Sequence, residues 1–167
     1  MDKKTKTFLV ILLAVYSAAL TWIILFKMAV RLEDVGFGTV RAWNMIPFRY
    51  SEETSFHLTE VLENVIAFVP LGVYLGMLKT GAWKAILIGA AASVTLEVLQ
   101  FALGIGAADI TDVITNTAGT AIGVGIYLLL THIFKNREKL DKTLVIVCGA
   151  ATVVMIILIA LLIGGNL

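Results

Sequence analysis

The sequence predicts an all-α membrane protein, a polytopic helical bundle of about five transmembrane helices with a cytoplasmic N-terminus. Three observations support this prediction: the apolar composition, a set of long apolar segments, and an uneven distribution of Lys and Arg. Of the 167 residues, 59% are hydrophobic and 15% are charged, and the mean hydropathy is +0.95. A soluble domain of this length cannot bury so much apolar surface, whereas lipid can cover it.

Each predicted helix corresponds to an apolar segment close to the length of about 20 residues that crosses a bilayer. We expect helices because backbone polar groups in lipid must be satisfied within the segment, and no alternating pattern is present. The first segment follows three lysines, as a signal peptide would, but its apolar run is too long, which predicts an uncleaved anchor. We expect a single domain over residues 1–167. The predicted spans are Phe8–Phe26, Val61–Leu78, Ala85–Leu103, Val113–Phe134 and Thr143–Ile163.

The distribution of basic residues predicts the orientation. With the N-terminus inside, nine Lys and Arg flank the helices on the cytoplasmic side and four lie outside, which satisfies the positive-inside rule. The inner residues are Lys3, Lys4, Lys6, Lys79, Lys84, Lys135, Arg137, Lys139 and Lys142. The outer residues are Lys27, Arg31, Arg41 and Arg49.

This orientation places nearly all the other notable polar residues at the outer ends of the helices. Ionisable groups at a membrane boundary are costly to desolvate, so they usually indicate function. The midplane holds only Ser and Thr, such as Ser93 and Thr120, which argues against a transporter. The outer residues are Glu60, Glu63, Asn64, Glu97, Gln100, Asp109, Asp112 and Asn116.

Spacing assigns these residues to shared helix faces, because positions three or four apart are neighbours on a helix. Asp112 would be a good N-cap for a helix that begins at Val113; the alternative is a helix that starts near Asp109. Capping does not explain Glu97, which lies about a turn and a half inside an apolar run. The aligned sets are Glu60 with Asn64, Glu97 with Gln100, and Asp109 with Asp112 and Asn116.

Small residues predict which helices pack most closely. GxxxG spacings occur at Gly72 and Gly76 and at Gly119 and Gly123, and the third helix carries a related small-residue pair. Such residues let helices approach in lipid, so we expect a tight bundle of the second to fourth helices with the first and fifth at its periphery. Pro70 is expected to disturb the second helix. The amphipathic segment 27–60 is either an interfacial segment or a lid over the polar site.

Four short motifs occur in an order and spacing that resemble the VanZ-like family of small bacterial membrane proteins. The resemblance covers about residues 44–123 and implies a multi-pass protein of the bacterial cytoplasmic membrane. The family's namesake is linked to low-level resistance to teicoplanin, a lipid-tailed glycopeptide. The motifs are Asn44-Met-Ile-Pro47-Phe48, Asn64-Val-Ile-Ala-Phe68-Val-Pro70-Leu-Gly72, Glu97-Val-Leu-Gln100, and Asp109, Asp112, Asn116 and Gly119.

This chain departs from the family pattern at one position. The family usually carries an arginine three residues before the first aspartate, where this chain has Gly106. Arg41 or Arg49 from the outer segment is a candidate to replace that cation in space.

Three kinds of function remain open for the outer polar residues. The first is recognition of a lipid-tailed antibiotic by an outward-facing pocket, with Asn64, Gln100, Asn116, Arg41 and Arg49 as ligand-binding residues. The second is an intramembrane enzyme that acts on a lipid-linked envelope intermediate, with Glu97, Asp109 and Asp112 as the acid–base candidates. The third is a Mg²⁺ or Ca²⁺ site, to which His57 could add a ligand.

A further interpretation is that the amides only join helices. It explains the outer carboxylates poorly. We expect no cofactor, since no standard catalytic or phosphate-binding motif is present. We expect membrane lipid and no nucleic acid as a partner, because the basic residues flank helices without forming an aromatic-rich patch. The sequence leaves oligomeric state and catalysis open.

Overall fold

Five long helices account for most of the chain. A computed structural model describes residues 2–26, 38, 40–48 and 54–164. In these ranges, each of the five helices is long and apolar enough to cross a membrane, which confirms the predicted helical membrane bundle. Their bounds are Lys3–Phe26 (α1), Thr54–Met77 (α2), Ala82–Leu103 (α3), Ile110–Ile133 (α4) and Arg137–Gly164 (α5).

The centre of the bundle is the contact between α2 and α4. A Cβ atom at Gly72 would overlap the Thr120 carbonyl, and one at Gly123 would overlap the Val69 carbonyl. The two backbones therefore touch where both helices carry glycine. On α3, a Cβ at Gly89 would overlap the side chain of Thr120. The small-residue spacings thus correctly predicted a tight bundle of α2, α3 and α4.

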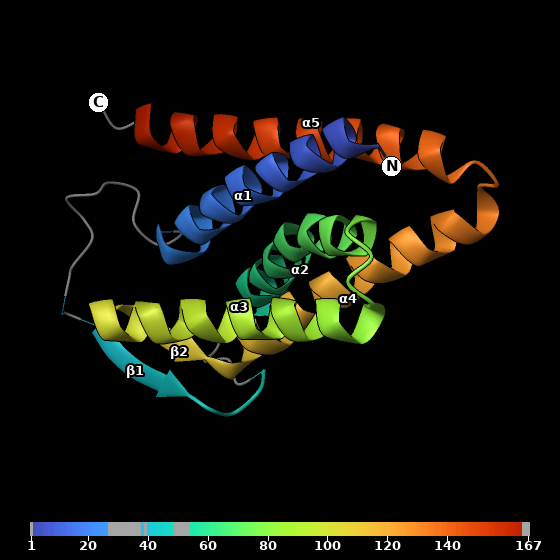
Figure 1. Ribbon diagram of the computed structural model, residues 1–167. Coiled ribbons are helices and arrows are strands. Elements are labelled where there is room, and N and C mark those ends of the chain that lie inside the picture. The colour runs from blue at the N-terminus through green and yellow to red at the C-terminus, as the bar shows by residue number, and fades with distance from the viewer. Residues whose placement is uncertain (1, 27–37, 39, 49–53, 165–167) are drawn as a thin grey trace.

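The helices α1 and α5 lie together on one side of this bundle (Figure 1). Only 11% of the most apolar stretch of α5 is buried, as expected for a peripheral helix that faces lipid. Tyr16 of α1 is fully buried and its hydroxyl donates a hydrogen bond to the Ala67 carbonyl of α2. Pro70 lies inside α2 and removes the helical donor to the Ile66 carbonyl, one residue before the carbonyl that the Tyr16 hydroxyl contacts. The hydroxyls of Tyr74 and Thr152 join α2 to α5 over 2.9 Å.

Two short strands lie outside the helices, and the sequence prediction missed them. Val40–Asn44 (β1) and Ile105–Asp109 (β2) pair in parallel, with Val40 opposite Ile105 and Asn44 opposite Asp109. The strand β2 lies between the predicted spans Ala85–Leu103 and Val113–Phe134. Gly104 ends α3 in a left-handed conformation, with φ of 66°, and a Cβ there would overlap Gly38. Glycine at this position allows the chain to reverse and run beside α3.

The N-terminus, the α2–α3 turn and the α4–α5 turn lie at one end of the molecule (Figure 1). An ion pair of 3.9 Å between Asp2 and Lys142 joins the chain before α1 to the start of α5. This is the end that carries the nine predicted inner Lys and Arg. The charge rule therefore assigns it to the cytoplasm, and assigns β1 and β2 to the outer side.

Cysteine labelling tests the orientation. In a protein whose buried Cys148 is replaced by Ala, Thr54→Cys at the start of α2 should react with a membrane-impermeant maleimide added outside intact cells. Asn136→Cys, at the α4–α5 turn, should react only after the cells are permeabilised. The reverse labelling pattern would refute the assignment of the outer side.

A matched glycine pair tests the α2–α4 contact. Gly123→Ala should lower the free energy of unfolding by about 1–3 kcal/mol, because the added methyl group overpacks a backbone contact. Gly125→Ala is the control on the same helix, since a Cβ at Gly125 meets nothing within 4 Å. Denaturant unfolding of both variants in detergent measures the difference. Equal stability of the two variants would show that α2 and α4 are not in backbone contact.

Candidate functional site

Asp109 links three elements at the outer end of the bundle. It ends β2 and is the N-cap of α4, where its Oδ1 atom accepts a hydrogen bond of 2.7 Å from the Thr111 backbone N–H. Its Oδ2 atom accepts one of 2.9 Å from the side-chain amide of Asn44 on β1. Its own backbone N–H donates to Glu97 Oε2 on α3, also over 2.9 Å. One residue therefore fixes β1, α3 and α4 to one another.

Asp112 is not the N-cap of α4, so that alternative was wrong. The helix begins at Ile110, three residues earlier than expected, because Asp109 provides the cap. Asp112 instead lies in the first turn, where it is only 8% exposed. Its Oδ1 atom accepts a hydrogen bond of 2.7 Å from the Asn64 side chain of α2. A hydrogen bond between two buried side chains thus joins α2 to α4.

Asn116 lies one helical turn below Asp112 on the same face of α4 and is fully buried. Its side-chain N–H donates a hydrogen bond of 2.9 Å to the Ser93 hydroxyl of α3. Its Oδ1 atom is buried and has no hydrogen-bond partner within the described ranges. The polar contacts therefore continue inward from the carboxylates along the interface between α3 and α4.

We refer to Asn44, Asn64, Glu97, Asp109, Thr111 and Asp112 as the outer polar cluster. The structure brings together three carboxylates and one amide that the sequence predicted as site residues. Sequence reasoning gave no site role to Asn44, Thr111 or Ser93. Two of these three residues could have been found from the sequence: Asn44 belongs to a family motif, and Thr111 lies two residues after Asp109, an aspartate that could cap a helix. Ser93 has no comparable signal in the sequence.

Gln100 and Glu63 have other surroundings. The buried Gln100 side chain donates a hydrogen bond of 2.9 Å to the Ile24 carbonyl and so holds the end of α1 against α3. Glu63 is exposed although it precedes the buried Asn64. Glu60, one turn before Asn64, is partly buried. The side chain of His57 lies outside what the structure describes.

Arg41 lies directly across the β ladder from Gly106. Its side chain is exposed, and a Cβ at Gly106 would meet Gln100 Nε2 at an ordinary contact distance of 3.7 Å. Gly106, where the family usually carries an arginine, and Arg41 of this chain are therefore neighbours on paired strands. Arg49, the other candidate, lies outside the described residues.

Glu97 and Asn64 lie deeper than the outer ends of α3 and α2, whereas Asp109 and Asp112 lie at the outer end of α4. Glu97 precedes the end of α3 at Leu103 by six residues (103 − 97), and Asn64 follows the start of the apolar span of α2 at Leu58 by six (64 − 58). Six residues of helix rise about 9 Å. Carboxylates at such a depth need polar partners, which the cluster supplies. No group of three or more His, Cys, Asp or Glu within the described ranges could hold a metal ion, so the structure lends no support to the metal hypothesis.

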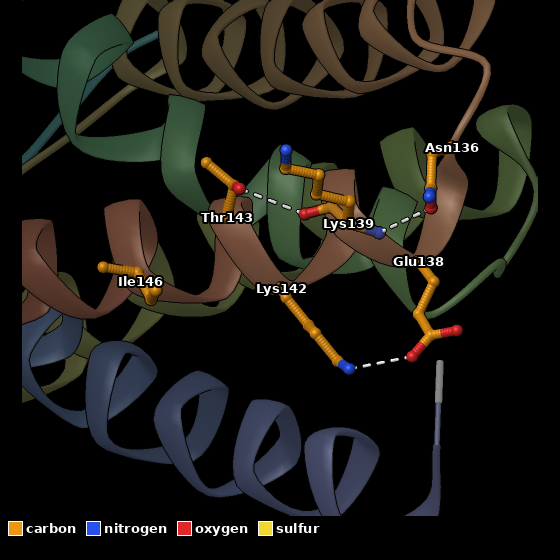
Figure 2. A pocket seen from close by; sticks show the side chains of 6 residues that line it. All are labelled: Asn136, Glu138, Lys139, Lys142, Thr143 and Ile146. Carbon is orange, nitrogen blue, oxygen red and sulfur yellow. Dashed lines mark hydrogen bonds and ion pairs between the residues drawn. The ribbon is translucent and has the colours of Figure 1, made fainter.

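A second polar feature lies at the opposite, inner end. A shallow hollow of about 400 Å³ is lined by Asn136, Glu138, Lys139, Lys142, Thr143 and Ile146 (Figure 2). Lys142 pairs with Glu138 over 2.8 Å, and Asn136 Oδ1 accepts a hydrogen bond from the Lys139 backbone N–H. These groups mainly satisfy one another and the start of α5, and the candidate site that the sequence predicted is the outer polar cluster.

The fold and the cluster define a class: a small multi-pass helical membrane protein with carboxylates and amides set into the outer ends of its central helices. The VanZ/LLP1 family model matches residues 13–131. Protein VanZ of Enterococcus faecium is 36% identical over 143 residues, which cover 81% of this chain and 83% of the relative. No solved structure matches the chain. The chain belongs to the VanZ/LLP1 family, as the motifs predicted, and is a VanZ-like membrane protein of a family associated with glycopeptide resistance.

Proposed function

We propose that this chain lowers susceptibility to lipid-tailed glycopeptide antibiotics of the teicoplanin type, acting at the outer leaflet of the bacterial cytoplasmic membrane. The similarity to Protein VanZ over most of both chains supports this proposal. The structural observation that carries it is the outer polar cluster, which gathers three carboxylates: Glu97 and Asp112 within the apolar spans of α3 and α4, and Asp109 at the N-cap of α4. Helix packing alone does not require so many charges there.

The cluster has an accessible rim and a buried base. Asn44 and Asp109 are partly exposed, and Arg41 on the same strand as Asn44 is exposed. Asn64, Glu97 and Asp112 are between 2% and 8% exposed. In this proposal the rim meets the sugar, peptide and amine groups of the ligand, while the base holds the rim in position. Asn44 and Asp109 of the rim, together with the neighbouring Arg41, therefore offer an amide and both signs of charge. This combination suits a ligand with many hydrogen-bonding groups.

The contacts favour recognition over catalysis. Each of the three carboxylates accepts a hydrogen bond from an amide of the protein itself, namely the backbone of Asp109, the side chain of Asn44 and the side chain of Asn64. Such bonds fix the shape of a binding surface. No contact in the described ranges assigns a proton-transfer step to any of these residues, so we do not propose an enzyme that acts on a lipid-linked intermediate.

Two matched carboxylate variants test the proposal. Glu97→Gln should abolish protection against teicoplanin, because it removes the negative charge beneath the rim that attracts the amine groups of the ligand in this proposal, while the amide oxygen still accepts the hydrogen bond from the Asp109 backbone N–H. Its melting temperature and membrane level should therefore stay close to wild type. Glu63→Gln removes an exposed carboxylate from α2 and should retain full protection. The measurement is the minimum inhibitory concentration of teicoplanin for a susceptible host that expresses each variant at equal level.

Two results would contradict the proposal. Wild-type protein that gives no protection in this host would refute the antibiotic as the relevant ligand. Full protection by Glu97→Gln would remove the outer polar cluster from the function. A large loss of stability in Glu97→Gln would instead assign Glu97 to helix packing.

A further inference from the structure

The end of β1 and the turn that follows it expose an unusual number of large hydrophobic side chains. The exposed fractions are 58% for Trp43, 65% for Met45, 51% for Ile46 and 51% for Phe48. No charged residue lies between Arg41 and Arg49. A contiguous apolar surface of this kind needs a partner.

The geometry places this turn at the depth of the bilayer rather than above it. Gly104 reverses the chain after α3, and β2 then runs back along α3 until the Asp109 backbone N–H reaches Glu97. Since β1 is parallel to β2 and Asn44 pairs with Asp109, β1 also descends (Figure 1). Asn44 therefore lies level with Glu97, about 9 Å below the outer end of α3. The exposed turn begins at that depth.

The apolar side chains of the turn continue the lipid-facing surface of α3. Trp43 packs on Phe101 with 4.4 Å between ring centroids. Val94, Val98 and Phe101 follow the i, i+4, i+7 spacing of a single helix face. Val94 and Val98 are 47% and 49% exposed, as expected for side chains that face lipid. Trp43 is therefore adjacent to a stripe that a transmembrane helix presents to acyl chains.

Two backbone donors of the turn bond to side chains of the outer polar cluster. The Ile46 backbone N–H donates to Asn44 Oδ1 over 3.3 Å, and the Phe48 backbone N–H donates to the Thr111 hydroxyl over 3.1 Å. Backbone donors within a bilayer must find protein partners, since lipid provides none. These two backbone N–H groups therefore face the protein, while the large apolar side chains are exposed.

We propose that residues 40–48 form a re-entrant segment whose Trp43, Met45, Ile46 and Phe48 side chains insert among the acyl chains of the outer leaflet. The partner is the hydrocarbon of the membrane itself. The segment re-enters from the outer side, descends as β1 and turns beside the first turn of α4. Through the bond between Asn44 and Asp109, it holds the rim of the polar cluster below the level of the lipid headgroups. This proposal does not depend on an antibiotic ligand.

Fluorescence quenching of Trp43 tests the proposal. The full chain with Trp22→Phe and Trp83→Phe keeps Trp43 as its single tryptophan. It is reconstituted into phosphatidylcholine vesicles with bromines at acyl carbons 6,7 or 11,12. Brominated lipid should remove most of the Trp43 emission, and aqueous acrylamide should remove little. The control keeps Trp83 alone; Trp83 is 71% exposed in the first turn of α3 at the inner end and should be more accessible to acrylamide.

Two other outcomes would overturn the proposal. Quenching of Trp43 by acrylamide and not by brominated lipid would place the turn in water. Protection of Trp43 from both quenchers would mean that protein covers it, either a second copy or another part of this chain. Melting temperatures of the two single-tryptophan variants close to wild type would show that each compared protein is folded.

Discussion

The hydrogen bond from the Asp109 backbone to the Glu97 carboxylate is the contact on which the outer half of the molecule depends. It fixes the end of β2 to α3 about 9 Å below the end of that helix. From that point, Asp109 caps α4 and holds Asn44 of β1. Without this acceptor, β2 would have no polar attachment to α3 at its lower end. A carboxylate in an apolar helix is costly, and this position gives it a backbone donor.

The bilayer imposes the second constraint, which connects the cluster to the glycines. Helices in lipid gain little from apolar contact alone, so α2 and α4 associate through backbone contact at Gly72 and Gly123. This contact brings together Asn64, about two turns further out than Gly72, and Asp112, about three turns further out than Gly123, so that they bond. The resulting hydrogen bond then stabilises the same helix pair. The small residues and the polar cluster therefore act on one interface, and the rigid interface keeps the accessible groups at fixed positions.

The sequence alone was sufficient to predict the five helices and most members of the outer polar cluster. Length and hydropathy predicted the five helices because the membrane restricts their form, and GxxxG spacing predicted the central bundle. The two strands could not be predicted, because five-residue segments such as Ile105–Asp109 carry no periodic signal and pair with a segment far away in the sequence. The same pairing made Asp109 the cap in place of Asp112 and brought in Asn44. For Gln100, spacing on α3 could not show that its partner is the Ile24 carbonyl of α1.

Amide hydrogen exchange at residues 104–109 tests the central claim most directly. The comparison is wild type with Glu97→Gln, which keeps an acceptor for the Asp109 N–H, and with Glu97→Leu, which has none. The account predicts slow exchange of this segment in wild type and Glu97→Gln, and fast exchange in Glu97→Leu, where the 40–44 strand should also lose protection. The interior of α4 should stay protected in all three proteins, which excludes general unfolding. Equal exchange of residues 104–109 in all three would contradict the claim that Glu97 holds the outer half of the structure together.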